Sequence, residues 1–285
     1  MKTLCVLMTC HNRKEKTVRC INSLNAEKTE KCLTQIYMVD DGCTDGTAEA
    51  VHSMTTRVSI INGDGNLFWN RGMHLAFSRA VRDHFDFYLW VNDDVEFYPK
   101  AIDKLIESYE LLSKRQKDII VVGPTMDSTG TFNTYGGFAA KKSMKPFEAK
   151  RVYMDKDYQK ILIFHGNCVL IPQEVVEKIG VNDPFYEHGY GDADYSLMAA
   201  QKGCGCWLTN YPVGICERHN ESFTFLDASL PIRERLRTFH SRTNHPRKDD
   251  LHFYKKFYGI WWPYKAFSQD IKIVISGIVY KLRKR

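Results

Sequence analysis

Two adjacent carboxylates follow a strongly apolar segment near the middle of the chain. Phe87–Val91 is aromatic and β-branched, which predicts a buried strand, and it runs directly into Asn92-Asp93-Asp94. Two carboxylates at the end of a buried strand are unfavourable unless a cation lies beside them. Ligands bind at this edge of open α/β sheets, and Mg²⁺ and Mn²⁺ prefer oxygen ligands. The segment therefore predicts a metal site, and an acidic loop or helix cap before Pro99 is the alternative.

Acidic residues recur at two further places of this kind, each at the end of a predicted strand or the start of a predicted helix. The carboxyl ends of parallel strands meet at one edge of a sheet, so we expect the three clusters to converge there. Solvated loops do not explain such a convergence. The clusters are Asp40/Asp41, Asp93/Asp94 and Asp192/Asp194.

Strand and helix signals alternate through the first 122 residues. This alternation predicts an α/β fold with a mostly parallel central sheet and helices on both of its faces. The predicted strands are 3–9, 35–39, 58–61, 87–91 and 119–122, and the predicted helices are 14–24, 47–54, 70–84 and 100–112.

The pattern changes after Pro124. Residues 128–146 are rich in Gly, Ser, Thr and Lys and predict a loop or hairpin over the sheet edge. A strand is predicted over 161–171 with an interruption at His165-Gly166-Asn167, followed by a short helix that starts at Pro172. The last predictions in this part are a helix over 194–202 and strands over 207–210 and 213–216.

Composition is ordinary for a globular protein, with 44% hydrophobic and 26% charged residues among 285. No segment has the length of a transmembrane helix, and the short apolar start predicts a first strand rather than a signal peptide. The nine scattered cysteines predict buried thiols in a reducing cytoplasm. Cys204-Gly-Cys206 has no second pair to complete a zinc site.

Positive charge is concentrated at the C-terminal end. Residues 233–285 hold fourteen Lys or Arg against four Asp or Glu, a net charge of +10, whereas the whole chain carries +6 and residues 1–232 therefore −4. Apolar side chains recur at helical spacing from Ile271 to Leu282, after an aromatic stretch. This composition predicts a domain over 1–232 and a basic, aromatic helical tail over 233–285 on an anionic membrane surface. Packing on the domain or in a homodimer is the alternative, and no motif points to nucleic acid.

Five segments, taken together and in order, resemble glycosyltransferase family 2 over about residues 1–220. Residues 7–13 (Leu-Met-Thr-Cys-His-Asn-Arg) resemble the end of the family's first strand, and residues 39–47 its Val-Asp-Asp-Gly-Ser-Thr-Asp-Gly-Thr signature, with Cys43 for Ser. Residues 65–73 resemble the donor-site segment of a bacterial branch. Residues 92–94 stand at the Asp-x-Asp metal motif, and 188–197 match the late acidic motif.

The resemblance implies a GT-A nucleotide-diphospho-sugar transferase fold and a role for each matched residue. Asp94 is implied as a ligand of Mn²⁺ or Mg²⁺, and Asp93 as a contact to the metal through water or to the donor's ribose or sugar. Asp41 would accept hydrogen bonds from the base or ribose. Asp192 matches the base that takes the acceptor's proton in an inverting displacement, and Asp194 is a helix cap or an acceptor contact. The other implied donor contacts are Thr9, His11, Asn12, Arg13, Asn66, Trp69 and Gly72; for Trp69 a core aromatic is the alternative.

Three residues near these motifs have two readings each. His219 follows the late acidic motif, where some relatives place a metal-binding histidine, although a lone His is as often structural. His165 and Gly166 are candidate acceptor contacts, with a capped turn as the alternative.

Asn92 replaces the first carboxylate of the metal motif, and Gly191 stands where the late motif usually has Glu, so we expect weaker metal binding than in the family at large.

The sequence is therefore interpreted as a metal-dependent inverting glycosyltransferase of bacterial type at the cytoplasmic face of a membrane. Its donor would be a nucleotide-diphospho-sugar and its acceptor a glycan or lipid-linked glycan, as in cell-surface polysaccharide synthesis. A nucleotidyltransferase on a related fold and a non-catalytic sugar-binding or scaffold protein are the alternatives. A dinucleotide oxidoreductase is excluded because the first strand is followed by Cys-His-Asn-Arg-Lys-Glu and not by Gly-x-Gly-x-x-Gly.

Overall fold

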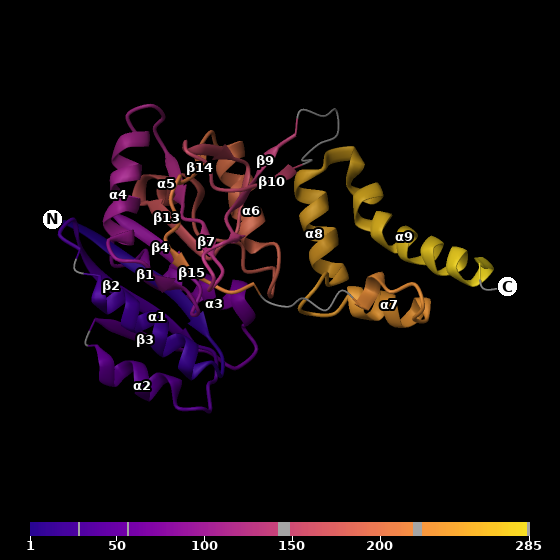
Figure 1. The fold of residues 1–285 in the computed structure, drawn as a ribbon, viewed down its shortest axis with the longest axis horizontal. Coiled ribbons are helices and arrows are strands. Elements are labelled where there is room, and N and C mark those ends of the chain that lie inside the picture. The colour runs from indigo at the N-terminus through magenta and orange to yellow at the C-terminus, as the bar shows by residue number, and fades with distance from the viewer. Residues whose placement is uncertain (28, 56, 142–148, 219–223, 284–285) are drawn as a thin grey trace. The chain divides into compact units, whose positions relative to one another are not determined.

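Six strands of one large sheet run in the same direction, as the alternation of strands and helices predicts (Figure 1). The computed structural model describes residues 1–285 except 28, 56, 142–148, 219–223 and 284–285. The order of the eight strands in the sheet is β11-β14-β6-β13-β4-β1-β2-β3. Their bounds are β1 Lys2–Cys10, β2 Cys32–Asp40, β3 Val58–Asn62, β4 Phe87–Val91, β6 Ile119–Val122, β11 Gln159–Ile161, β13 Cys168–Pro172 and β14 Gly205–Leu208.

The strand β13 lies antiparallel between β4 and β6. Its first residue, Cys168, pairs with Val91, the last residue of β4. The residues that precede β13 therefore lie at the same edge of the sheet as the residues that follow β4. The predicted interruption at 165–167 is confirmed, and it separates two strands of different sheets, because β12 (Ile163–Phe164) belongs to a small three-stranded sheet.

Helices cover both faces of the sheet, and the side chains of β1 show how. Alternate residues of a strand point to opposite faces. Leu4, Val6 and Met8 belong to one buried cluster with residues of α1, α2 and α4. Cys5 and Leu7 belong to another with residues of α3, α5 and α6. The bounds are α1 Lys14–Ala26, α2 Thr47–Met54, α3 Phe68–Ala80, α4 Ala101–Leu112, α5 Gln173–Ile179 and α6 Gly191–Gln201.

Two small sheets complete this part of the chain. One has the order β10-β9-β12 and the other the order β5-β15-β7-β8. The predicted loop or hairpin over 128–146 contains β8 and β9 and extends into residues outside the described part. The remaining bounds are β5 Glu96–Phe97, β7 Thr125–Met126, β8 Asn133–Tyr135, β9 Gly137–Ala140, β10 Ala149–Val152 and β15 Gly214–Ile215.

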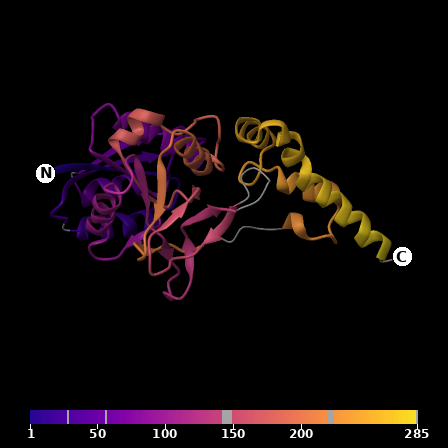
Figure 2. The same cartoon turned by 90° about the horizontal axis from the view of Figure 1, so that it is seen from above.

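The chain divides into two compact units. The first contains Met1–Pro184 and Gly191–Arg218, and the second contains Phe185–Tyr190 and His219–Arg285. The second unit is helical, with η1 Thr224–Leu226, α7 Ile232–Phe239, α8 Arg247–Phe257, η2 Gly259–Trp261 and α9 Trp262–Arg283. The helix α9 is the long yellow helix of Figure 2 and has 22 residues.

The helices α7 and α9 pack around a buried arginine. The guanidinium of Arg235, which is 2% exposed, donates hydrogen bonds to the carbonyl of Ile273 at 3.1 Å and to the hydroxyl of Ser276 at 2.9 Å. Gly277 lies against Ile232, where a Cβ atom would come within 2.6 Å of that side chain. The segment that the sequence predicts as a helical tail is thus part of a packed helical unit. No helix among the described residues has the length and apolarity needed to span a bilayer.

Candidate active site

Three parallel strands bring the predicted site residues to one edge of the central sheet. Cys10 at the end of β1 pairs with Asp40 at the end of β2, and Leu7 of β1 pairs with Trp90 near the end of β4. The turns that follow these strands therefore start side by side. This is the edge where open α/β sheets bind ligands.

Asp93 and Asp94 share the guanidinium of Arg13. Nη1 of Arg13 lies 2.8 Å from Asp93 Oδ1, and Nη2 donates a short hydrogen bond to Asp94. Both carboxylates are buried, and burial raises the pKa of Asp93 to about 6, with Asp94 adding to the rise and Arg13 opposing it. The amine of Lys16 is 3.8 Å from Asp94. Arg13 and, at a longer distance, Lys16 therefore lie beside two carboxylates, which is one cation for each acid.

Asp93 and Asp94 have different neighbours. Asp93 accepts a hydrogen bond from the Thr17 hydroxyl of α1 at 3.2 Å, while Asp94 Oδ1 lies 3.4 Å from the Cys216 thiol. Two adjacent carboxylates are an oxygen donor set that fits Mg²⁺ or Mn²⁺. The sequence prediction places Arg13 among the donor contacts, and it misses Thr17 and Cys216, which no motif marks because they reach the pair only through the fold.

Asp41 is buried and holds the loop that precedes α3. Its Oδ1 accepts a hydrogen bond from the amide of Gly65 at 2.8 Å, and its Oδ2 accepts from the amides of Leu67 and Phe68 at 3.0 and 3.1 Å. The neighbouring Asn66, a predicted donor contact, is exposed in this loop. Asp41 therefore orders the segment that resembles a donor site.

The turn after β1 is tied to the loop after β2. Nδ1 of His11 donates to the carbonyl oxygen of Asp41 at 2.5 Å, and Asn12 Oδ1 accepts from the amide of Thr44 at 2.7 Å. Asn12 has a positive φ of 51°, a conformation that asparagine tolerates better than most residues. His11 and Asn12 are exposed, so both side chains are open to a ligand at this edge.

The helix α3 lies close against β1 because Gly72 has no side chain. A Cβ atom on Gly72 would come within 2.2 Å of the Thr9 hydroxyl oxygen. Two predicted donor contacts thus meet in the structure, where Gly72 has a packing role.

Trp69, Asn92, Gly166 and Asp192 form a second cluster at the edge. The indole Nε1 of Trp69 donates to Asn92 Oδ1 at 2.8 Å. The amide of Gly166 donates to Asp192 Oδ2 at 3.2 Å, and a Cβ atom on Gly166 would come within 2.5 Å of the Trp69 ring. The position of β13 explains this meeting, because Gly166 precedes that strand and Asn92 follows β4.

His165 immediately precedes Gly166 in the segment between β12 and β13. Burial lowers the pKa of His165, and Asp192 opposes this shift. Its ring Nδ1 accepts a hydrogen bond from the amide of Gly136 at 3.2 Å, and its ring contacts Tyr135 and Phe138. His165 is thus held in the first unit by backbone and aromatic contacts.

The two acids of the late motif differ in access. Both lie in the first turn of α6, which begins at Gly191, three residues before the predicted start. Asp192 is partly exposed, whereas Asp194 is 2% exposed. Of the two, Asp192 is the more accessible to solvent. His219, the predicted metal ligand, lies outside the described residues.

The family model described as glycosyl transferase family 2 matches residues 5–180. This match covers more than half of the chain. The chain belongs to glycosyl transferase family 2. The central sheet with helices on both faces is the GT-A fold of these transferases, as predicted.

One solved structure similar to this family 2 member is that of GalNAc-T7 with UDP, GalNAc and Mn²⁺. The two chains are 14% identical with a TM-score of 0.56, and the alignment covers 100% of this chain and 58% of that chain. The chain therefore spans less than two thirds of the length of this structural neighbour. No protein in a search of curated sequences matches significantly.

Proposed function

We propose that this family 2 member is an inverting hexosyltransferase that moves a sugar from a nucleotide-diphospho-sugar to a glycan or lipid-linked glycan. The observation that carries the proposal is the partly exposed Asp192 beside Trp69, at the sheet edge that also holds the buried pair Asp93 and Asp94. A base and a cation-attracting acid pair at one edge are what a sugar transfer from a diphosphate needs. The solved neighbour with UDP, GalNAc and Mn²⁺ supports this donor class.

On the donor side, the acid pair would bind the cation, and the loops after β1 and β2 would contact the nucleotide. Asp94 would ligate Mn²⁺ or Mg²⁺, and Asp93 would reach the cation through water or hold the donor's ribose or sugar. A divalent cation bound here offsets the charge that develops on a departing diphosphate. His11, Asn12 and Arg13 would line the nucleotide pocket, which the loop ordered by Asp41 completes.

On the acceptor side, Asp192 would accept the proton of the attacking hydroxyl. The bond between the anomeric carbon and the diphosphate oxygen breaks, the bond from the acceptor oxygen to that carbon forms, and nucleoside diphosphate leaves. The amide of Gly166 fixes one Asp192 oxygen, so the carboxylate is oriented before the acceptor arrives. Trp69 would border the donor sugar, and His165 the acceptor sugar.

Product analysis tests this function. Full-length protein is incubated with UDP-, dTDP- and GDP-sugars, Mn²⁺ and candidate glycan acceptors, and the released nucleotide is identified. We expect nucleoside diphosphate and a new glycosidic bond of inverted configuration, and loss of the Mn²⁺-dependent turnover in Asp94→Asn. Release of pyrophosphate would identify a nucleotidyltransferase instead, and donor binding without turnover would identify a non-catalytic sugar-binding protein.

We further propose that this transferase is of bacterial type and works at the cytoplasmic face of a membrane, with residues 1–232 catalytic and 233–285 attached to lipid. The outer face of α9 supports the lipid contact. With 3.6 residues per turn, its buried Ala266, Ile273 and Gly277 lie on the side opposite a stripe of apolar side chains that are 40–65% exposed. The stripe consists of Tyr264, Phe267, Ile271, Ile275, Ile278, Val279 and Leu282.

Basic residues flank this apolar stripe on both sides. The same periodicity places Lys265 and Lys272 along one border and Lys281 along the other. The one acid of α9, Asp270, pairs with Arg247 and His240, so it does not offset the positive border. An apolar stripe between cations is the pattern of a helix that lies in the surface of an anionic bilayer.

Vesicle sedimentation tests the lipid contact. We expect full-length protein to bind anionic vesicles at low salt and to be released at high salt, since such attachment contributes about 1 kcal/mol per basic residue near the surface. The double variant Ile271→Ser/Ile278→Ser should lose binding. Leu226→Ser, which removes an equally exposed apolar side chain of the same unit away from the stripe, should keep it. If the double variant instead dissociates a dimer and vesicle binding is unchanged, the stripe is a subunit contact.

A further inference from the structure

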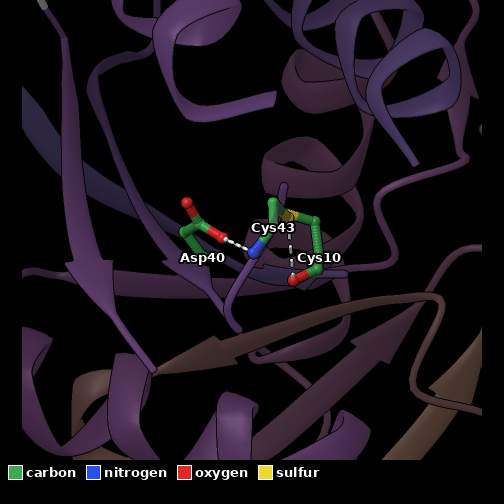
Figure 3. Close-up of side chains that lie close together, drawn as sticks. All are labelled: Cys10, Asp40 and Cys43. Atoms are coloured by element: carbon green, nitrogen blue, oxygen red, sulfur yellow. Dashed lines mark hydrogen bonds between the residues drawn. The ribbon is translucent and has the colours of Figure 1, made fainter. Parts of the chain in front are cut away.

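Two cysteines and an aspartate meet at the ends of β1 and β2 (Figure 3). The ligand atoms of Cys10, Asp40 and Cys43 all lie within 4.8 Å of one another. Cys10 and Asp40 are partners in the parallel ladder, and Asp40 Oδ1 accepts a hydrogen bond from the Cys43 amide at 2.7 Å. In the part of the chain that the structure describes, this is the one trio of His, Cys, Asp or Glu found at such mutual distances.

The spacing of the two sulfur atoms matches a tetrahedral zinc site. The Sγ atoms of Cys10 and Cys43 are 3.9 Å apart. Zinc–sulfur bonds are about 2.3 Å long, so two thiolates on one tetrahedral zinc ion lie about 3.8 Å apart. Without a metal, burial raises the pKa of both thiols, and Asp40 adds to the rise at Cys43. The backbone amide of Asn12, 3.2 Å from the Cys43 sulfur, is placed to stabilise a thiolate.

We propose that Cys10, Asp40 and Cys43 bind one thiophilic divalent cation, Zn²⁺, with water in the fourth position. Cys43 is only partly buried, which leaves that position open to solvent. Binding converts two S–H groups into thiolates and releases two protons to the buffer. The site is distinct from the pair Asp93 and Asp94, whose oxygen atoms suit Mg²⁺ or Mn²⁺, because soft thiolate ligands select a different metal.

A cation at this site would link two segments of the proposed donor pocket. The bond between Asn12 and Thr44 already ties the turn after β1 to the loop after β2, and Cys10 and Cys43 belong to the same two segments. Zn²⁺ joins these segments through Cys10 and Cys43. We therefore expect Zn²⁺ to stabilise the folded protein by RT ln(1 + [Zn²⁺]/Kd), so that the melting temperature rises with the free Zn²⁺ concentration.

Metal titration of the full chain tests the proposal. Zn²⁺ is titrated against a chromophoric chelator in excess Mg²⁺, and proton release is measured by calorimetry in buffers of different ionisation enthalpy. We expect one Zn²⁺ per chain, release of two protons, and a thiolate charge-transfer band when Co²⁺ replaces Zn²⁺. In Cys43→Ser the Zn²⁺ affinity should fall at least 100-fold, beyond the roughly 10–100-fold cost of losing a group outside the ligand shell. Asp40→Asn should also weaken binding.

Matched variants make the result decisive. Cys32→Ser removes a buried thiol at the opposite end of β2, and Asp94→Asn alters the oxygen site, and both should keep wild-type Zn²⁺ affinity. Melting temperatures without metal show that each variant is folded. The proposal is overturned if Cys43→Ser and Asp40→Asn bind Zn²⁺ like wild type, if Cys32→Ser loses as much as Cys43→Ser, or if Co²⁺ shows no thiolate band.

Discussion

The acid pair of the first unit and Glu187 of the second have different electrostatic surroundings. In the first unit, Asp93 and Asp94 share one guanidinium, and burial raises the pKa of Asp93 to about 6. In the second unit, Glu187 alone receives Lys248 and Arg242, and the hydrogen bond from Lys248 is the main cause that lowers its pKa to about 2. Burial of an acid therefore does not distinguish a site from a structural ion pair. The number of cations for each carboxylate differs: Asp93 and Asp94 have Arg13 and the more distant Lys16 between them, whereas Glu187 has two cations to itself. A further cation is therefore more favourable beside the pair than beside Glu187.

The largest effect is expected where an acid of the sheet edge meets substrate. Asp192→Asn removes the proton acceptor but keeps the side-chain shape, so turnover should fall by about 10²–10⁴-fold while donor affinity and melting temperature stay near wild type. Steady-state kinetics and calorimetry with the donor measure both. Asp194→Asn, at a buried position, should lower the melting temperature instead. Turnover near wild type in Asp192→Asn would show that Asp192 is not the base and would make Asp194 the next candidate.

Removing the shared guanidinium sharpens the comparison. Arg13→Gln leaves two buried carboxylates with only the more distant Lys16 beside them, which should reduce the free energy of unfolding by about 3–5 kcal/mol. Mn²⁺ should restore part of this loss, since it supplies the missing positive charge. Urea unfolding with and without Mn²⁺ measures the effect.

The matched control for Arg13→Gln is Arg19→Gln. Arg19 lies in α1 and pairs with Glu96 at 2.9 Å, but both side chains are about half exposed, so the loss should stay within about 1 kcal/mol and should not respond to Mn²⁺. Equal Mn²⁺ effects in the two variants would contradict the view that the acid pair is a cation site.

The smallest effect is expected at Glu187, the acid of the second unit that pairs with two cations, and this effect depends on pH. The pKa of Glu187 is lowered to about 2 from 4.5, so its ion pairs stabilise the folded state above pH 4.5 and this contribution is lost as the pH falls from about 4.5 to about 2. Glu187→Gln should be less stable by about 1–3 kcal/mol at neutral pH and show a shallower loss in acid. Melting curves between pH 7 and pH 3 test this, with the exposed Glu96→Gln as control. Parallel curves for wild type and Glu187→Gln would exclude the assigned role.

Most strands and helices of the first 122 residues could be predicted because each carries a hydrophobic pattern of its own, whereas the two-residue strand β5 was missed. The strand β4 was predicted at its observed bounds, Phe87–Val91, since all five side chains are buried and apolar. The direction of β13 could not be predicted, because an apolar run reads the same in a parallel or an antiparallel ladder. The helix α9 begins at Trp262, well before the predicted helical stretch, and Pro263 fits this start because proline is tolerated in a first helical turn.

Site residues were predictable where a motif fixes them and not where distant segments meet. The convergence of Asp41 and Asp93 on one edge follows from the parallel order of β1, β2 and β4. The partners of Asp41 are the backbone amides of Gly65, Leu67 and Phe68. Almost every residue type has a backbone amide, so the sequence does not indicate which of them will donate. The contact between Trp69 and Gly166 likewise depends on the antiparallel strand β13, so it has no signal in the sequence.

The antiparallel strand β13 also sets the order in which the chain can fold during synthesis. Residues 87–91 and 119–122 leave the ribosome long before 168–172, the segment that pairs with both. Until then β4 and β6 each expose an inner edge of the future sheet, and exposed apolar edges are prone to pair with other chains. The ladder closes through contacts between residues far apart in sequence, which slows folding. The nascent first unit is therefore most exposed to aggregation, and most in need of a chaperone, in the interval between the synthesis of β6 and that of β13.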